Sequence, residues 1–142
     1  MSITVTELFE EFEHLPDWED RCDFLIDLGF ELPELTEAEK CEQNIVRGCQ
    51  SRVWLVAEYD ESQQPPVVNI RADSEAMIVK GLIAVLLAVY SGKTPEEILT
   101  IDVQAVFQKL GLTTHLSSTR RNGLFGMVNR IRSFAAEHHS TA

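Results

Sequence analysis

The feature that most constrains the fold is a long apolar segment in the middle of the chain. Residues 81–90 carry no charged side chain, and the apolar pattern extends back toward Asp73, interrupted chiefly by Lys80. A helix that is apolar nearly all round is normally buried on every side. We therefore predict a central helix that is capped by Asp73 or Ser74 and runs to about Tyr90. Its apolar length falls far short of the about 20 residues that span a membrane.

The rest of the chain must supply elements that cover this helix. Apolar residues at helical spacing, separated by Pro16, predict helices over 6–15 and 17–30, with Gly29 ending the second. Thr94-Pro95-Glu96-Glu97 is a typical helix start. Further helices are expected over 95–99, 103–110 and from Ser117 or Ser118 to about Glu137.

Alternating apolar residues predict two strands between the helical regions. Arg52–Tyr59 and Val67–Ala72 flank a turn with two prolines and should form an antiparallel hairpin. Asn44–Val46 is expected to add a third short strand. The order of helices, a small sheet and more helices predicts the α+β class, with residues 1–142 forming a single domain.

Charge is concentrated in the first part of the chain. Residues 1–42 carry fourteen acidic side chains and two basic ones, within a net charge of −11 for the whole protein. Such a surface disfavours nucleic-acid binding. Two interpretations stay open, a solvated helical face or a docking face for a basic partner. The opening residues resemble no secretory signal or transit peptide, so we expect a cytoplasmic protein in which its three cysteines are thiols.

Cys49 is the strongest candidate for a chemical role. Gly48 before it permits a tight turn, and Gln50 and Ser51 after it can form hydrogen bonds within a loop. Arg52 and a second arginine at position 47 flank it, and positive charge lowers the pKa of a thiol. The pattern is typical of a nucleophilic cysteine, while a plain buried cysteine is the alternative.

Other candidate sites have weaker support in the sequence. Cys22 lies on the apolar face of an expected helix and is interpreted as a core residue. A zinc site could join Cys41, Cys49, His115 and Asp73, but no ligand spacing supports it. The last helix carries four arginines within thirteen residues, and the glycines at 123 and 126 suggest that another backbone approaches it closely.

Three separated blocks resemble the SufE-like family, the Fe–S metabolism associated domain. They are Asn44-Ile45-Val46-Arg47-Gly48-Cys49-Gln50-Ser51-Arg52-Val53-Trp54, then Ala72-Asp73-Ser74-Glu75-Ala76 with Ile78-Val79-Lys80-Gly81-Leu82, and then Leu116-Ser117-Ser118-Thr119-Arg120-Arg121-Asn122-Gly123-Leu124. The resemblance covers nearly the whole chain. It implies the α+β fold that the family shares with iron–sulfur scaffold proteins of the IscU/NifU type.

The resemblance also implies a function. SufE-like proteins accept sulfane sulfur from a PLP-dependent cysteine desulfurase, stimulate that enzyme and pass the sulfur on for iron–sulfur cluster assembly. By this resemblance Cys49 is the acceptor, Arg120 lies near the desulfurase-facing surface, and Asp73 lies close to the cysteine loop. The implied partners are a SufS-like desulfurase and a SufB-like scaffold.

No cofactor, nucleic acid or membrane is expected as a partner. Two alternatives remain, a metal- or cluster-binding scaffold of the IscU type on the same fold, and a docking module whose thiol is incidental.

Overall fold

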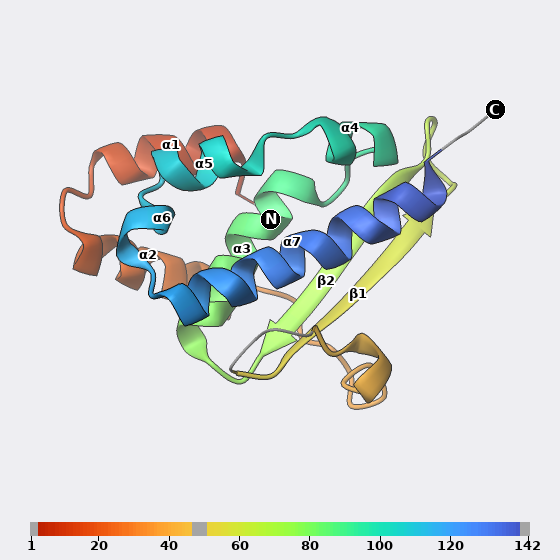
Figure 1. The fold of residues 1–142 in the computed structure, drawn as a ribbon, viewed down its shortest axis with the longest axis horizontal. Coiled ribbons are helices and arrows are strands. Elements are labelled where there is room, and N and C mark those ends of the chain that lie inside the picture. The colour runs from red at the N-terminus through yellow and green to blue at the C-terminus, as the bar shows by residue number, and fades with distance from the viewer. Residues whose placement is uncertain (1–2, 47–50, 140–142) are drawn as a thin grey trace.

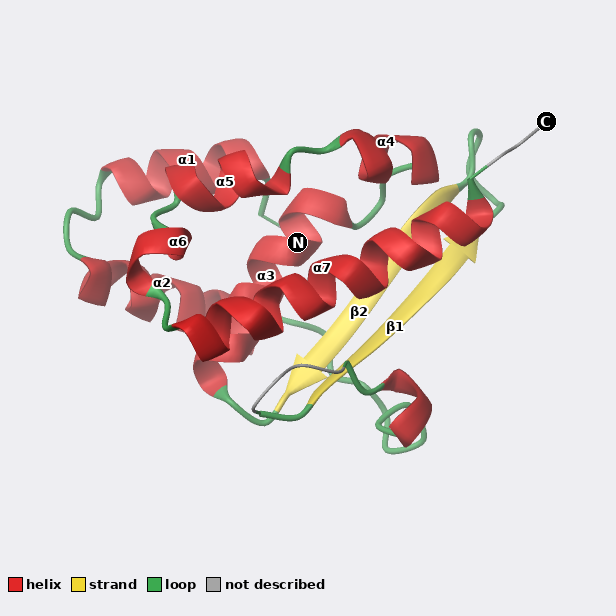
Figure 2. Cartoon of the chain, in the orientation of Figure 1, coloured by secondary structure: helices red, strands yellow, loops and turns green. Residues whose placement is uncertain are grey.

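The fold is built from helices and one small sheet, as predicted for the α+β class. The computed structural model describes residues 3–46 and 51–139. Its elements are, in order, α1 (Val5–Glu13), α2 (Trp18–Phe30), the 3-10 turn η1 (Glu42–Asn44), β1 (Val53–Asp60), β2 (Val67–Ser74), α3 (Met77–Tyr90), α4 (Pro95–Thr100), α5 (Val103–Lys109), α6 (Leu112–His115) and α7 (Ser118–His138). Figure 1 shows their arrangement, and Figure 2 shows how the helices gather beside the single strand pair.

The two predicted strands form the expected antiparallel hairpin. β1 pairs with β2 in a register that runs from Val53 opposite Ser74 to Asp60 opposite Val67. Alternate side chains of each strand therefore point to opposite faces of the sheet.

The predicted third strand over 44–46 is wrong, because the described residues of the sheet contain two strands. Asn44 belongs instead to η1, and its side-chain amide donates to the carbonyl of Glu39 at 2.7 Å. This turn leaves a single bridge between Ile45 and Trp54, with the Val46 N–H donating to the Val53 carbonyl at 2.9 Å. The hydrogen bonds of the turn compete with the extended ladder that a strand requires.

One face of the sheet is covered by helices, and the other is covered mainly at the end that carries Trp54. On one face lie α3 and α7, and Figure 1 shows α7 crossing in front of the two strands. On the other face the ammonium group of Lys40 lies 5.6 Å from the centre of the Trp54 ring. Arg71 on β2 binds Glu39 from the same segment. Trp54 is consequently buried although it points away from Val53 and Leu55.

The predicted central helix is confirmed as α3. Most of its side chains are buried, including Leu82, Val85, Leu86 and Tyr90, and its C-terminal end is close to the predicted one. The predicted start is wrong, since Asp73 and Ser74 stay in β2 and the helix begins at Met77 after the N-cap Ala76. Pairing of Asp73 with Trp54 in the ladder holds the backbone extended there.

Helices α2 and α3 cross with their backbones in close contact. A Cβ atom added at Gly81 would lie 2.6 Å from the Leu25 carbonyl oxygen, and one added at Gly29 would lie 2.7 Å from the Lys80 Cβ. The structure confirms the predicted end of α2 at Phe30, with Gly29 in its last turn. Glycine stands there because the neighbouring helix occupies the space of a side chain.

The C-terminal helices occur where the sequence predicts them, with one addition. The Ser117 side chain accepts the N–H of Arg120 and caps α7. The short helix α6 was not predicted; it follows Gly111, which has a φ of 77°. In the part of the chain that the structure describes, no helix combines the length and apolarity needed to cross a membrane.

Candidate functional site

The candidate cysteine lies outside the described residues, as do Gly48 and Gln50, but the chain on both sides of them is described. The Val46 N–H donates to the Val53 carbonyl at 2.9 Å and so closes the base of the segment between them. On the far side, the Ser74 hydroxyl donates to the Arg52 carbonyl at 2.8 Å. The backbone is therefore held at both ends of the cysteine segment by the hairpin.

Arg52 has a defined partner at this position. Its guanidinium donates to both carboxylate oxygens of Glu75, at 3.0 and 2.7 Å, and lies 5.3 Å from the centre of the Trp54 ring. The hydrogen bonds raise the pKa of Arg52 and lower the pKa of Glu75. Because Glu75 offsets its charge, Arg52 stabilises a nearby thiolate less than the sequence pattern suggests.

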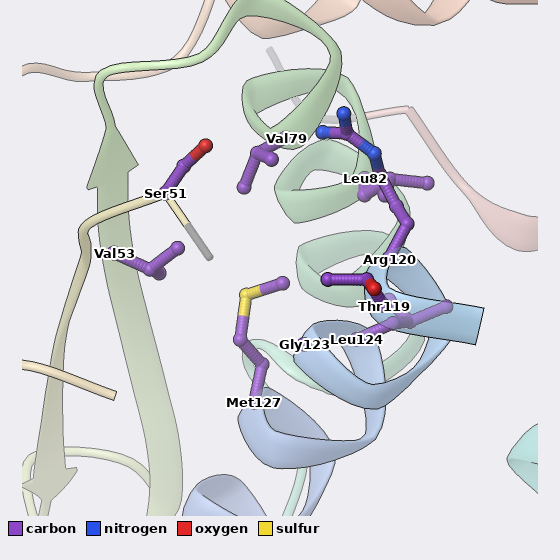
Figure 3. Close-up of a pocket in the computed structure, with 9 residues that line it drawn as sticks. All are labelled: Ser51, Val53, Val79, Leu82, Thr119, Arg120, Gly123, Leu124 and Met127. Carbon is purple, nitrogen blue, oxygen red and sulfur yellow. The ribbon is translucent and has the colours of Figure 1, made fainter. Parts of the chain in front are cut away.

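A small cavity adjoins the described end of the cysteine segment. Its volume is about 30 Å³, enough for a single water-sized group. It is lined by Ser51 and Val53 from the hairpin, Val79 and Leu82 from α3, and Thr119, Arg120, Gly123, Leu124 and Met127 from α7. Figure 3 shows the Met127 side chain pointing from α7 into the space between these elements. The site is mostly apolar, with a serine, a threonine and an arginine at its edge.

Two predicted site residues, Ser51 and Arg120, meet at this cavity although the sequence places them far apart. No carboxylate of the described residues lies within ion-pair distance of Arg120. The neighbouring Arg121 differs, because its guanidinium donates to the Thr113 carbonyl at 3.2 Å. Of these two arginines, only Arg120 lines the cavity.

Asp73 lies in β2, one residue before Ser74, and its closeness to the cysteine loop stays a prediction because residues 47–50 lie outside the described structure. It is buried in β2 and is not among the residues that line the cavity. Its carboxylate lies 3.5 Å from the Lys40 ammonium and 3.3 Å from the Lys80 ammonium. It thus ties the segment before η1 and helix α3 to the sheet. Its link to the cysteine segment runs through Ser74, whose hydroxyl holds Arg52.

Two residues of the hypothetical zinc site, Asp73 and His115, have other partners. Asp73 is held by two lysines, and the His115 ring stacks on Trp18 with the ring centres 4.7 Å apart. Across residues 3–46 and 51–139 no three histidine, cysteine or carboxylate side chains gather at metal-binding distance. The described part of the site therefore offers no set of metal ligands.

The two described cysteines are free thiols. Cys22 on α2 is partly buried, and burial raises its pKa, with a smaller contribution from the charge of Asp23. A raised pKa means less thiolate at neutral pH, which agrees with the predicted packing role. Cys41 is partly exposed and precedes η1.

The acidic face of the N-terminal helices consists of solvated side chains. In the described structure no carboxylate of α1 or α2 forms an ion pair. This observation agrees with the interpretation as a solvated face, and a docking role there stays a prediction.

The apolar lining of the cavity was not predicted as part of a site. Val79, Leu82, Leu124 and Met127 are ordinary core residues in the sequence pattern. The available signal is their helical spacing, which places 79 with 82 and 120 with 124 and 127 on one face of each helix. Only the packing of α3 against α7 shows that the two faces meet beside Ser51.

Comparisons with known proteins agree with this arrangement. A solution structure of a hypothetical protein from Thermus thermophilus has the same fold, with a TM-score of 0.71, 20% sequence identity, and coverage of 94% of this chain and 93% of that one. Two uncharacterized SufE-like proteins are similar over 132 residues. The one from Rhizobium etli is 45% identical and the one from Rhizobium meliloti is 42% identical, each over 93% of this chain and over 89% and 94% of its own length.

The family model for SufE, described as an Fe–S metabolism associated domain, matches residues 6–135. The match includes both described ends of the cysteine segment and every residue that lines the cavity. The chain therefore belongs to the SufE family.

Proposed function

We propose that this protein accepts persulfide sulfur on Cys49 from a PLP-dependent cysteine desulfurase, stimulates that enzyme and delivers the sulfur for iron–sulfur cluster assembly. The observation that carries the proposal is the position of Ser51. This residue follows Cys49 by two positions and lines the same cavity as Arg120. The described end of the cysteine segment therefore borders a mostly apolar cavity that also carries an arginine. Family membership supports the same chemistry.

The transfer is an exchange between a thiol and a persulfide. The Cys49 thiolate attacks the outer sulfur of the persulfide on the desulfurase, so that an S–S bond forms on Cys49 while the S–S bond of the donor breaks. The donor cysteine leaves as a thiolate and takes up the proton that Cys49 lost. The reaction needs no external oxidant or reductant, and its rate depends on the thiolate fraction and on access.

The cavity gives this exchange two properties. Its apolar lining disfavours a charged thiolate, so we expect a thiol that packs there to stay protonated and to ionise once a partner exposes it. We expect Arg120, at the edge of the cavity that Ser51 also lines, to stabilise the persulfide anion of Cys49 with its positive charge. The SufS-like desulfurase and the SufB-like scaffold are the partner classes that family membership makes the first to test.

A direct test follows sulfur to individual cysteines. Reduced protein is incubated with a cysteine desulfurase and L-cysteine, persulfides are trapped by alkylation, and tryptic peptides are analysed by mass spectrometry. Cleavage after Lys and Arg places the three cysteines on separate peptides, 22–40, 41–47 and 48–52. We expect one added sulfur atom on peptide 48–52 and none on the other two.

Two variants separate this proposal from its alternatives. A Cys49→Ser chain should neither gain sulfur nor stimulate the desulfurase, whereas Cys41→Ser should behave as the wild type. Full stimulation by Cys49→Ser would identify a docking module whose thiol is incidental. Absence of added sulfur on wild-type peptide 48–52 with every desulfurase of the source organism would refute the sulfur-acceptor role.

A further inference from the structure

The segment that leads into Cys49 is held by an arginine of α7. The guanidinium of Arg130 donates through Nη1 to the Ile45 carbonyl at 3.0 Å and through Nη2 to the Gln43 carbonyl at 2.6 Å. These two carbonyls lie on either side of the place where η1 ends and the bridge to β1 begins. A planar guanidinium that binds two carbonyls fixes both position and direction, which a single hydrogen bond does not.

A groove beside α7 adjoins this contact. Gly126 lies one helical turn before Arg130, and the two line the same groove together with Ile45 and Val46. Segment 42–46 therefore borders this groove, and the close backbone approach that the glycines suggested stays a prediction. Arg130 secures the segment from one side, and the hydrogen bond between Val46 and Val53 secures it from the other.

We propose that Arg130 is a positioning residue for Cys49, because it sets the direction in which the chain leaves Val46. Two residues lie between Val46 and Cys49, and an extended chain covers at most about 11 Å over those three steps. A change in residues 43–46 is therefore made close to the thiol in the chain, and we expect it to alter how the thiol is presented. The inference rests on the proposed function only where it concerns sulfur transfer.

The chain contains a matched control for Arg130. Arg132 lies on the same helix and also donates to two backbone carbonyls, those of Ile98 at 3.5 Å and Leu99 at 3.3 Å, which belong to α4. Replacing either arginine by alanine removes two hydrogen bonds to backbone carbonyls, but only Arg130→Ala releases the segment before Cys49. An Arg130→Lys variant keeps the charge and one point of attachment.

The experiment measures the rate at which iodoacetamide alkylates Cys49 in the folded, reduced full-length chain. The rate on peptide 48–52 is divided by the rate on peptide 22–40, which contains Cys22, and urea unfolding of every variant verifies that it folds. We expect Arg130→Ala to raise this ratio about fivefold or more, since a hydrogen bond of about 1 kcal/mol net corresponds to about fivefold in an equilibrium. Arg130→Lys should fall between, and Arg132→Ala should leave the ratio within about twofold.

Two results would overturn the inference. One is an unchanged ratio in Arg130→Ala, and the other is an equal change in Arg132→Ala, which would show a general loss of packing. The alkylation assay contains no desulfurase, so it tests the positioning role of Arg130 even if wild-type Cys49 accepts no sulfur. Where wild-type Cys49 does accept sulfur, Arg130→Ala should raise the KM of the desulfurase for this protein more than it lowers kcat.

Discussion

Replacing Gly81 by alanine tests the close crossing of α2 and α3. The added methyl group would lie 2.6 Å from the Leu25 carbonyl oxygen, 2.7 Å from the Leu25 carbonyl carbon and 2.9 Å from the Leu25 Cβ. Two of these atoms belong to the backbone of α2 and cannot rotate away. Moving the shortest contact out to the 3.4 Å of ordinary van der Waals contact requires the helices to separate by about 0.8 Å.

The sign of the stability change in Gly81→Ala shows whether helix propensity or overpacking dominates. Helix propensity alone favours alanine over glycine by about 1 kcal/mol. Overpacking a tight core costs about 1–3 kcal/mol, and a gap of about 0.8 Å forfeits a quarter to a half of each dispersion contact across the interface. Leu25 and Leu82, both fully buried in this region, lose contacts when the helices separate. We expect Gly81→Ala to lower the free energy of unfolding by about 2 kcal/mol.

The assay is urea unfolding followed by circular dichroism, with Gly29→Ala and the double variant measured alongside. Both glycines face the same crossing, so a separation caused by one substitution already makes part of the room that the other needs. The double variant should therefore lose less than the sum of the single losses. Gly92→Ala is the control, since its cost comes from a φ of 80° and no atom lies within 4 Å of the added methyl group.

Neutral or increased stability of Gly81→Ala would refute the close crossing, because propensity alone would then explain the result. Strict additivity of Gly29→Ala and Gly81→Ala would also contradict it. Either outcome would remove the physical reason for the glycine in the block Ile78-Val79-Lys80-Gly81-Leu82.

Three further predictions concern charged side chains. The hydrogen bonds from Arg71 are the main reason that the pKa of Glu39 falls from 4.5 to about 2. The stabilisation is therefore present above pH 4.5 and is lost as the pH falls through about 2. In urea unfolding, Glu39→Gln should lose less free energy of unfolding than the wild type across that pH window, and parallel pH curves would contradict the pairing. Asp73→Asn should lower the free energy of unfolding by about 1–3 kcal/mol because two partly buried lysines lose their partner, whereas Glu75→Gln, in an exposed pair, should cost less than about 1 kcal/mol; equal losses would contradict this difference. Arg120→Ala should change the free energy of unfolding by less than about 0.5 kcal/mol but slow sulfur transfer to Cys49 in the peptide assay, and an unchanged transfer rate would exclude the proposed role of Arg120 at the cavity.

Local patterns in the sequence were sufficient for most of the fold. Apolar alternation predicted the hairpin, helical spacing and caps predicted the α-helices apart from α6, and the absence of charge over 81–90 predicted the central helix. These signals concern neighbours within a few residues, where steric preferences and hydrogen-bond patterns act directly on the chain. The candidate cysteine and the arginine at position 120 were likewise identified from short motifs.

The errors occurred where distant residues compete with local preference. A serine or aspartate before an apolar helix ordinarily caps it, but here cross-strand pairing keeps Asp73 and Ser74 in β2. Gly29 was interpreted as a stop signal, whereas the structure shows that it makes room for α3. At Asp73 and Ser74, pairing with an element remote in sequence outweighs a capping preference worth about 1 kcal/mol.

The sequence by itself determined the fold class, the family and the residue that carries the proposed chemistry. The tertiary structure decided what surrounds that residue. Only the packing of α3, α7 and the hairpin brings Ser51 and Arg120 to one cavity. The same packing brings Arg130 to the segment before Cys49, where it donates to two backbone carbonyls. Every residue has a backbone carbonyl, so the sequence does not reveal which carbonyls a distant arginine will bind.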